Sequence, residues 1–119
     1  MLNLDTHVLV FALQESLTTK ERKLLDSAPW SISAIVLWEL AMLADAGRIT
    51  IDLEDVEVVR ALSRVHVWPL TLEICRESRK LDFRGDPADE LIAATSVVHA
   101  VPLVTRDRAI RASKRVPHA

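Results

Sequence analysis

The chain has 119 residues, of which 50% are apolar and 27% are charged, and its formal net charge is −2 at neutral pH. This length suits one domain, residues 1–119, that buries roughly two thirds of the surface of its unfolded chain. No apolar run approaches the ~20 residues that cross a bilayer. The slightly acidic balance excludes a global positive field of the kind that attracts nucleic acid.

The beginning of the chain and its cysteine content favour the cytoplasm. The segment MLNLDTHVLVFALQESL lacks the basic start of a secretory signal, and Asp5 and His7 interrupt its apolar part. The single Cys75 forms no intramolecular disulfide, which is typical of a reducing compartment. We therefore expect a cytoplasmic protein.

Short apolar runs alternate with helical patterns along the whole chain. Thr18 and Glu21 have the spacing of a capping box, and Ser33 and Gly47 suit the two ends of one helix. In the first half of the chain the patterns predict a strand at 2–4, helices at 6–13 and 18–27, a strand at 30–33, and helices at 34–46 and 52–64. The helix at 52–64 has an apolar stripe of Leu53, Val56, Val59 and Leu62. In the second half they predict a strand at 65–68, helices at 71–81 and 86–100, a strand at 102–105, a short helix after Asp107 and an edge strand at 114–118.

This alternation predicts an α/β fold. Strands joined through helices make right-handed crossovers and pair in parallel, which gives a central parallel sheet of about five short strands. Open sheets of this kind bind their ligands beyond the carboxyl ends of the strands. Residues that follow a predicted strand are therefore the first candidates for a functional site.

Acidic residues stand at that edge in four distant parts of the chain. Asp5 directly follows the first strand, and Asp107 lies just beyond the run LVT. Asp86 and Asp89 open a helix, and Glu39 sits about two turns into another, inside the apolar segment SAIVLWELAML. A lone carboxylate is rarely placed in apolar surroundings without a partner. We expect these side chains to converge.

Converging carboxylates require a cation, because like charges within a few ångströms repel one another or take up protons. Mg²⁺ or Mn²⁺ relieves this repulsion, since hard cations prefer carboxylate oxygens. A site of this kind typically cleaves phosphodiesters with a metal-activated water, and it needs no nucleophilic side chain.

Each acid also has a structural interpretation. Asp5, Asp86 and Asp107 suit helix N-caps, and Asp89 suits the first turn of a helix, where the macrodipole favours acids. Glu39 is open to an ion pair with an arginine. Taken singly these signals are weak, and the hypothesis depends on their joint placement at strand ends.

Three segments together resemble the PIN-domain family, and within it the VapC-type toxins of type II toxin–antitoxin systems: LNLDTHVLVFAL, ISAIVLWELAML and GDPADELIAATSVVHAVPLVTRD. The resemblance extends from Met1 to about Val116. It implies a three-layer α/β/α fold with a central parallel sheet and an endoribonuclease that depends on Mg²⁺ or Mn²⁺. It also implies a cognate antitoxin as partner, a homodimer and toxin–antitoxin hetero-oligomers.

The resemblance assigns roles residue by residue. The four family acids fall on Asp5, Glu39, Asp89 and Asp107, which become the expected metal ligands and catalytic residues. Expected substrate-binding residues are Thr6, Thr105 and Arg106. Thr105 suits either a hydrogen bond to a carboxylate or metal-bound water, or a plain strand position.

The sequence departs from the family pattern in two places. Glu90 stands where many relatives have Arg, so the site is either more negative or Glu90 points to solvent. The segment 14–27 is short, which bears on how an antitoxin docks.

Other residues leave alternatives open. His7 suits a structural role or a substrate contact. The segment from Arg106 to Ala119 suits either a basic face for RNA phosphates or a solvated helix face; its cations are Arg106, Arg108, Arg111, Lys114 and Arg115. Trp30, Trp38 and Trp68 suit the core or an interface.

The alternative function is a non-catalytic binding module of the same fold, whose acidic cleft docks a protein partner. A phosphatase or receiver-like domain is disfavoured, because no phosphoryl-accepting aspartate pairs with a downstream lysine on a strand.

Overall fold

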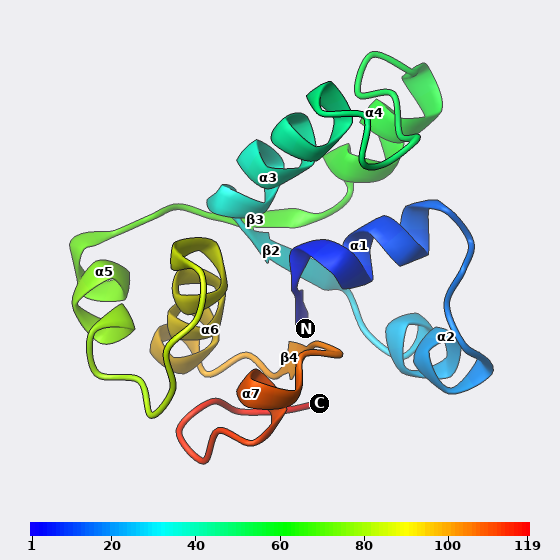
Figure 1. Ribbon diagram of the computed structural model, residues 1–119. Helices are drawn as coiled ribbons and strands as arrows, with labels where there is room; N and C mark the ends of the chain where they lie inside the picture. The colour runs from blue at the N-terminus through cyan, green and yellow to red at the C-terminus, as the bar shows by residue number, and fades with distance from the viewer.

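Four parallel strands form the centre of the computed structural model, which describes residues 1–119 (Figure 1). The order across the sheet is β3-β2-β1-β4, and each neighbouring pair is parallel. The predicted α/β class and parallel sheet are therefore confirmed. The strands are β1 (Leu2–Leu4), β2 (Trp30–Ser33), β3 (His66–Trp68) and β4 (Leu103–Val104).

The edge strand predicted at 114–118 is not formed, so the sheet has four strands rather than about five. A single parallel bridge joins Leu103 to His118. The Leu103 N–H donates to the Pro117 carbonyl at 2.8 Å, and the Ala119 N–H donates to the Leu103 carbonyl at 3.1 Å. Because Pro117 has no N–H, the tail cannot extend this pairing into a ladder.

Seven helices surround the sheet and produce three layers. In Figure 1, α5 and α6 lie on one side of the strands, and α1 and α2 lie on the other. None of the helices combines the length and apolar character that crossing a bilayer requires. The helices are α1 (Thr6–Leu13), α2 (Thr19–Asp26), α3 (Ala34–Asp45), α4 (Val56–Ser63), α5 (Leu72–Ser78), α6 (Pro87–His99) and α7 (Arg108–Arg111).

The helix ends follow the local signals in the sequence. Thr18 and Glu21 form the predicted capping box, in which the Glu21 N–H donates to the Thr18 hydroxyl at 3.1 Å and the Thr18 N–H donates to the Glu21 carboxylate at 2.9 Å. Ser33 caps α3 through the Ile35 N–H. Gly47 follows α3 with a φ of +69°, the left-handed conformation that favours glycine.

The helix predicted at 52–64 is shorter than expected and its apolar stripe is not a buried face. α4 begins at Val56, and Val56 and Val59 are 65% and 50% exposed. The residues of α4 that pack against the core are Val58 and Leu62, which are four positions apart and lie on one face of the helix. Of the predicted stripe, Leu53 and Leu62 therefore pack against the core, whereas Val56 and Val59 face solvent.

A buried polar link ties the central strand to the helix that carries Asp89. Asn3 in β1 is fully buried, and its Nδ2 donates to the Ser96 hydroxyl at 2.8 Å and to the Ile92 carbonyl at 3.3 Å. Buried polar groups are costly unless they are hydrogen-bonded. This pair of bonds therefore fixes α6 against β1, and with it the start of α6.

We expect Asn3→Ala to lower the free energy of unfolding by about 2 kcal/mol, because two buried acceptors on α6 lose their donor. Urea unfolding followed by circular dichroism measures this change. The matched control is Gln14→Ala, which removes an exposed bond to Thr50 of 3.4 Å and should change stability by less than about 0.5 kcal/mol. Equal losses in the two variants would contradict the role given to Asn3.

Candidate functional site

The strand order reverses between β1 and β4. The chain moves from β1 outward through β2 to β3, and it then returns to place β4 on the opposite side of β1. In open parallel sheets, the crevice beyond the carboxyl ends at such a reversal is where ligands bind. Asp5 directly follows β1 and Thr105 directly follows β4, so both residues stand at this reversal.

Thr105 connects the two aspartates at this point. Its hydroxyl donates to Asp5 Oδ2 and accepts the Asp107 N–H at 3.1 Å. Asp5 Oδ1 caps α1 by accepting the Val8 N–H at 2.9 Å, and Asp107 Oδ1 caps α7 by accepting the Ile110 N–H at 3.0 Å. The N-cap interpretation is therefore correct for both aspartates. Capping uses one oxygen of each, so it does not exclude a second role.

Glu39 faces this edge from α3. The Thr6 hydroxyl donates to Glu39 Oε1, and the glutamate is half-buried. The apolar segment around it is not buried on all sides, because Val36 and Leu40 lie in the core whereas Trp38 is 56% exposed. Glu39 thus lies on α3 between the face that packs in the core and the face that is exposed to solvent. No arginine pairs with it, so the ion-pair alternative is wrong.

Asp89, in the first turn of α6, is affected by the charges of the other acids. Its pKa is raised from 3.8 to about 6. Burial is the largest cause, because it disfavours the charged form, and repulsion from neighbouring carboxylates adds to it. These neighbours are, in order of effect, Glu39, Asp107, Asp86 and Asp5. We call these five residues, Asp5, Glu39, Asp86, Asp89 and Asp107, the acidic cluster.

Burial also raises the pKa of Asp5. The hydrogen bonds from Thr105 and from the Val8 N–H act in the opposite direction, as does the nearby His7. The charge of Asp107 raises the pKa further. His7 itself is exposed, so it stands beside the cluster with its ring open to solvent.

Asp86 belongs to the acidic cluster, although its sequence context suggested mainly a cap. It occupies the N-cap position of α6, but its side chain makes no capping hydrogen bond. Its charge instead acts on Asp89. The spacing of three residues between Asp86 and Asp89 was the available signal, since residues three apart neighbour each other on a helix. Because Asp-Pro is a common way to begin a helix, the sequence favoured the capping interpretation of Asp86 instead.

No side-chain cation neutralises the acidic cluster. The four ion pairs of the structure join Arg60 to Glu57, Arg79 to Glu90, Arg106 to Glu21 and Arg115 to Glu77, and none includes a member of the cluster.

The cluster fits a hard divalent cation by its charge and by its donor atoms, which are carboxylate oxygens. As the side chains stand, however, no three His, Cys, Asp or Glu groups are arranged to hold one ion. Asp5 and Glu39 accept hydrogen bonds from threonine hydroxyls. Binding an ion would require some of these carboxylates to turn toward it.

Glu90 does not make the site more negative, and it does not point to solvent. It is 5% exposed, and its Oε1 accepts a hydrogen bond of 2.6 Å from the Arg79 guanidinium of α5. Both expectations for Glu90 were wrong, because sequence alone did not show that α5 supplies a partner. The pair joins α5 to α6.

Arg106, expected to bind substrate, pairs with another side chain of the protein although it is exposed. Its guanidinium makes two bonds to Glu21, of 2.6 and 2.7 Å, and it lies 3.8 Å from the centre of the Phe11 ring. Arg115 pairs in the same two-bonded way with Glu77. The cations of this segment that make no ion pair are Arg108, Arg111 and Lys114.

Comparison with known proteins agrees with this geometry. The profile of the PIN domain family matches residues 3–115. The chain is 34% identical over 87 residues to Ribonuclease VapC22 of Mycobacterium tuberculosis, an alignment that covers 71% of this chain and 67% of that protein.

Solved structures share the fold. VapBC2 from Rickettsia felis, bound to a promoter DNA fragment, superposes with a TM-score of 0.74 at 19% identity and covers 100% of this chain and 98% of that one. DNA-bound VapBC from Salmonella typhimurium gives a TM-score of 0.72 at 23% identity, again over 100% and 98% of the two chains. The three-layer architecture inferred from sequence is therefore confirmed.

The raised pKa of Asp89 predicts a pH-dependent stability. Between pH 3.8 and about 6 the folded chain holds a proton at Asp89 that the unfolded chain has lost. The free energy of unfolding therefore falls as the pH rises through this window. We expect Asp89→Asn to be more stable than the unsubstituted protein at pH 7 and nearly equal to it at pH 4, by urea unfolding in EDTA.

Glu54→Gln is the control for this measurement, because Glu54 is exposed and lies outside the acidic cluster. It should follow the unsubstituted protein at both pH values. A gain for Asp89→Asn that is equal at pH 4 and pH 7 would count against the raised pKa of Asp89 as its source.

Proposed function

The chain belongs to the PIN-domain family, and from this premise we propose that it is a metal-dependent endoribonuclease, the toxin of a toxin–antitoxin pair. The relative from Mycobacterium tuberculosis is named a ribonuclease, and the solved structures of similar fold are named as toxin–antitoxin complexes. We take residues 1–119 as one nuclease domain that acts in the cytoplasm on RNA phosphodiesters.

One observation carries this proposal. Carboxylates from four separate parts of the chain repel one another at the β1–β4 reversal, and no lysine or arginine pairs with any of them. A protein that only needed helix caps would have no reason to gather these charges. We assign Asp5, Glu39, Asp89 and Asp107 as the groups that hold Mg²⁺ or Mn²⁺, with Asp86 beside them.

When bound, such a cation lowers the pKa of a water and offsets the charge that develops on the phosphate. The protein's contribution is to hold the ligands in place. Thr105 fixes the Asp5 carboxylate and the backbone of Asp107, and Thr6 fixes Glu39. We therefore assign both threonines as positioning residues, in place of the substrate contacts expected from sequence.

A cognate antitoxin is the proposed protein partner, within a hetero-oligomer that includes a homodimer of this chain. The surface beside Glu39 supports a partner, because α3 presents Leu37, Trp38 and Met42 with exposures of 38%, 56% and 47%. Large apolar side chains gathered on one helix face commonly mark an interaction site. Of the two roles considered for Trp38, this exposure favours the interface.

A non-catalytic binding module is the second candidate. It is favoured by the absence of three side chains arranged to hold one ion. In that case the acidic cluster would attract a basic partner and no RNA would be cleaved. Cleavage assays separate the two candidates directly.

We expect Asp5→Asn to lower the rate of RNA cleavage in Mg²⁺ or Mn²⁺ by more than about 100-fold, because the variant loses a charged ligand. Thr105→Val should lower it by about 10- to 100-fold, the range typical of partners that orient metal ligands. Asparagine can still accept the Val8 N–H, so the cap on α1 is retained. The assay follows a labelled single-stranded RNA, with EDTA abolishing activity.

Asp55→Asn is the matched control, since Asp55 caps α4 by accepting the Glu57 N–H at 2.8 Å and lies outside the acidic cluster. It should cleave RNA at the unsubstituted rate. Cleavage that persists in Asp5→Asn, or that survives EDTA in the unsubstituted protein, would refute the metal-dependent mechanism.

Divalent cations should also stabilise the protein in the absence of RNA. At a concentration 100-fold above its dissociation constant, a bound ion adds about 2.7 kcal/mol to the free energy of unfolding. We expect Mn²⁺ to raise the melting temperature of the unsubstituted protein and to have a much smaller effect on Asp89→Asn. An equal shift in the two proteins would argue that the ion binds elsewhere.

A further inference from the structure

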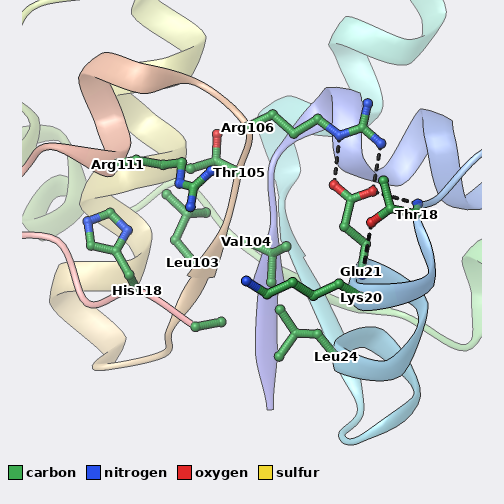
Figure 2. A pocket seen from close by; sticks show the side chains of 11 residues that line it. Thr18, Lys20, Glu21, Leu24, Leu103, Val104, Thr105, Arg106, Arg111 and His118 are labelled. Carbon is green, nitrogen blue, oxygen red and sulfur yellow. Dashed lines mark hydrogen bonds and ion pairs between the residues drawn. The ribbon is translucent and has the colours of Figure 1, made fainter.

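A second site adjoins the acidic cluster. A pocket of about 420 Å³ lies between α2 on one wall, β4 on its floor, and α7 with residues 118–119 on the other wall (Figure 2). This volume falls within the range of ~300–1,000 Å³ that is typical of small-ligand sites. None of the five residues of the acidic cluster lines it.

The side chains of this pocket carry positive charge. Lys20, Arg106 and Arg111 face one acid, Glu21, so three positive charges and one negative charge leave +2 with His118 neutral. The Glu21 carboxylate is fully engaged, because it accepts two bonds from Arg106 and one from the Thr18 N–H. Its pKa is lowered to about 2, chiefly by the Arg106 hydrogen bond.

Lys20 and Arg111 are the free cations of the pocket. Neither makes an ion pair, and Figure 2 shows their charged ends directed from opposite walls toward the same space. His118 donates from Nε2 to the Ser113 carbonyl at 3.1 Å, which leaves Nδ1 available to a ligand. These two cations come from segments more than 90 positions apart, so the pocket exists only in the folded chain.

Apolar side chains complete the lining. Leu24 of α2 and Leu103 of β4 lie in the same pocket, near the Lys20 side chain (Figure 2). A site with two free cations above an apolar floor suits a ligand that has an anionic group joined to a flat or apolar body. A nucleotide has this combination.

Thr105 places the pocket next to the acidic cluster. It lines the pocket, and its hydroxyl donates to Asp5. A chain that extends out of the cluster past Thr105 therefore enters a positively charged site. This matters for RNA, because the cluster itself repels phosphates.

We propose that this pocket binds a phosphate, with its nucleotide, of the single-stranded RNA next to the cleaved bond. Lys20 and Arg111 neutralise that phosphate and set the position of the strand, while the acidic cluster receives the bond to be cut. Phosphate contacts of this kind position a nucleic acid without reading its sequence. The inference rests on the proposed function, and it adds the residues that hold the substrate.

The test measures binding and cleavage of a labelled 12-nucleotide single-stranded RNA. Binding is followed by fluorescence anisotropy in the Asp5→Asn background with Mg²⁺, so that the RNA stays intact. We expect Lys20→Gln with Arg111→Gln to weaken binding about tenfold and to reduce the slope of log K against log salt by about 0.7, the value for one lost phosphate contact. In cleavage assays on protein that retains Asp5, the Lys20→Gln and Arg111→Gln pair should raise KM about tenfold and leave kcat unchanged.

The matched control is Lys23→Gln with Arg48→Gln, which removes two exposed cations outside the pocket. It should keep the affinity and the salt slope. Lys20→Arg, which retains the charge, should bind RNA as the unsubstituted residue does. Circular dichroism and melting temperatures confirm that each variant is folded.

The remaining outcomes overturn the inference. Equal losses in the pocket pair and the control pair would mean that only overall charge matters. Unchanged RNA binding together with lost affinity for a glutamate-rich dodecapeptide would assign the pocket to a protein partner instead. If the unsubstituted protein cleaves RNA, and the double variant at Lys20 and Arg111 binds RNA with unchanged affinity, the pocket proposal fails and the proposed function stands. If the unsubstituted protein cleaves no RNA with Mg²⁺ or Mn²⁺, the proposed function fails, and the pocket proposal fails with it.

Discussion

Repulsion among carboxylates at the carboxyl edge of β1 and β4 is the constraint on which the arrangement of this protein depends. Asp89 has a pKa of about 6, which burial raises most and to which Glu39 on α3 and the N-cap residues of α1, α6 and α7 add repulsion. The fold holds these groups together by means other than opposite charge. Asn3 fixes α6 to the central strand, and the hydroxyls of Thr6 and Thr105 hold two of the carboxylates. These contacts keep the acidic cluster in place against its own electrostatics.

Local signals in the sequence predicted most of this edge. Strand runs, the Thr18–Glu21 capping box and the glycine after α3 depend on neighbouring residues, so they were readable without a fold. The convergence of the acids followed from one further rule, that parallel strands place their carboxyl ends together. What the sequence could not provide was partner identity. Glu90 was misjudged because Arg79 lies on a different helix, and the role of Arg106 changed because Glu21 lies 85 positions away.

The same limit explains the errors in packing. The three-residue spacing placed Val56 and Val59 in one apolar stripe with Leu53 and Leu62, whereas Val56 and Val59 are exposed and Val58 packs against the core. In a helix of eight residues, both faces carry apolar side chains, and only the position of the neighbouring elements decides between them. The edge strand at 114–118 fails for a different reason, because Pro117 has no N–H to continue the pairing beyond the single bridge between Leu103 and His118.

The distribution of unpaired cations bears on how a protein of net charge −2 would approach RNA. The basic residues near the C-terminus are not equivalent, since Arg106 and Arg115 are neutralised by glutamates whereas Arg111 is not. Lys20 and Arg111 also make no ion pair, and both line the pocket beside the acidic cluster. A negative cluster and a positive pocket then adjoin at Thr105. Under the proposed function, a phosphate chain would be repelled by the first and attracted by the second, which would hold the strand beside the acids.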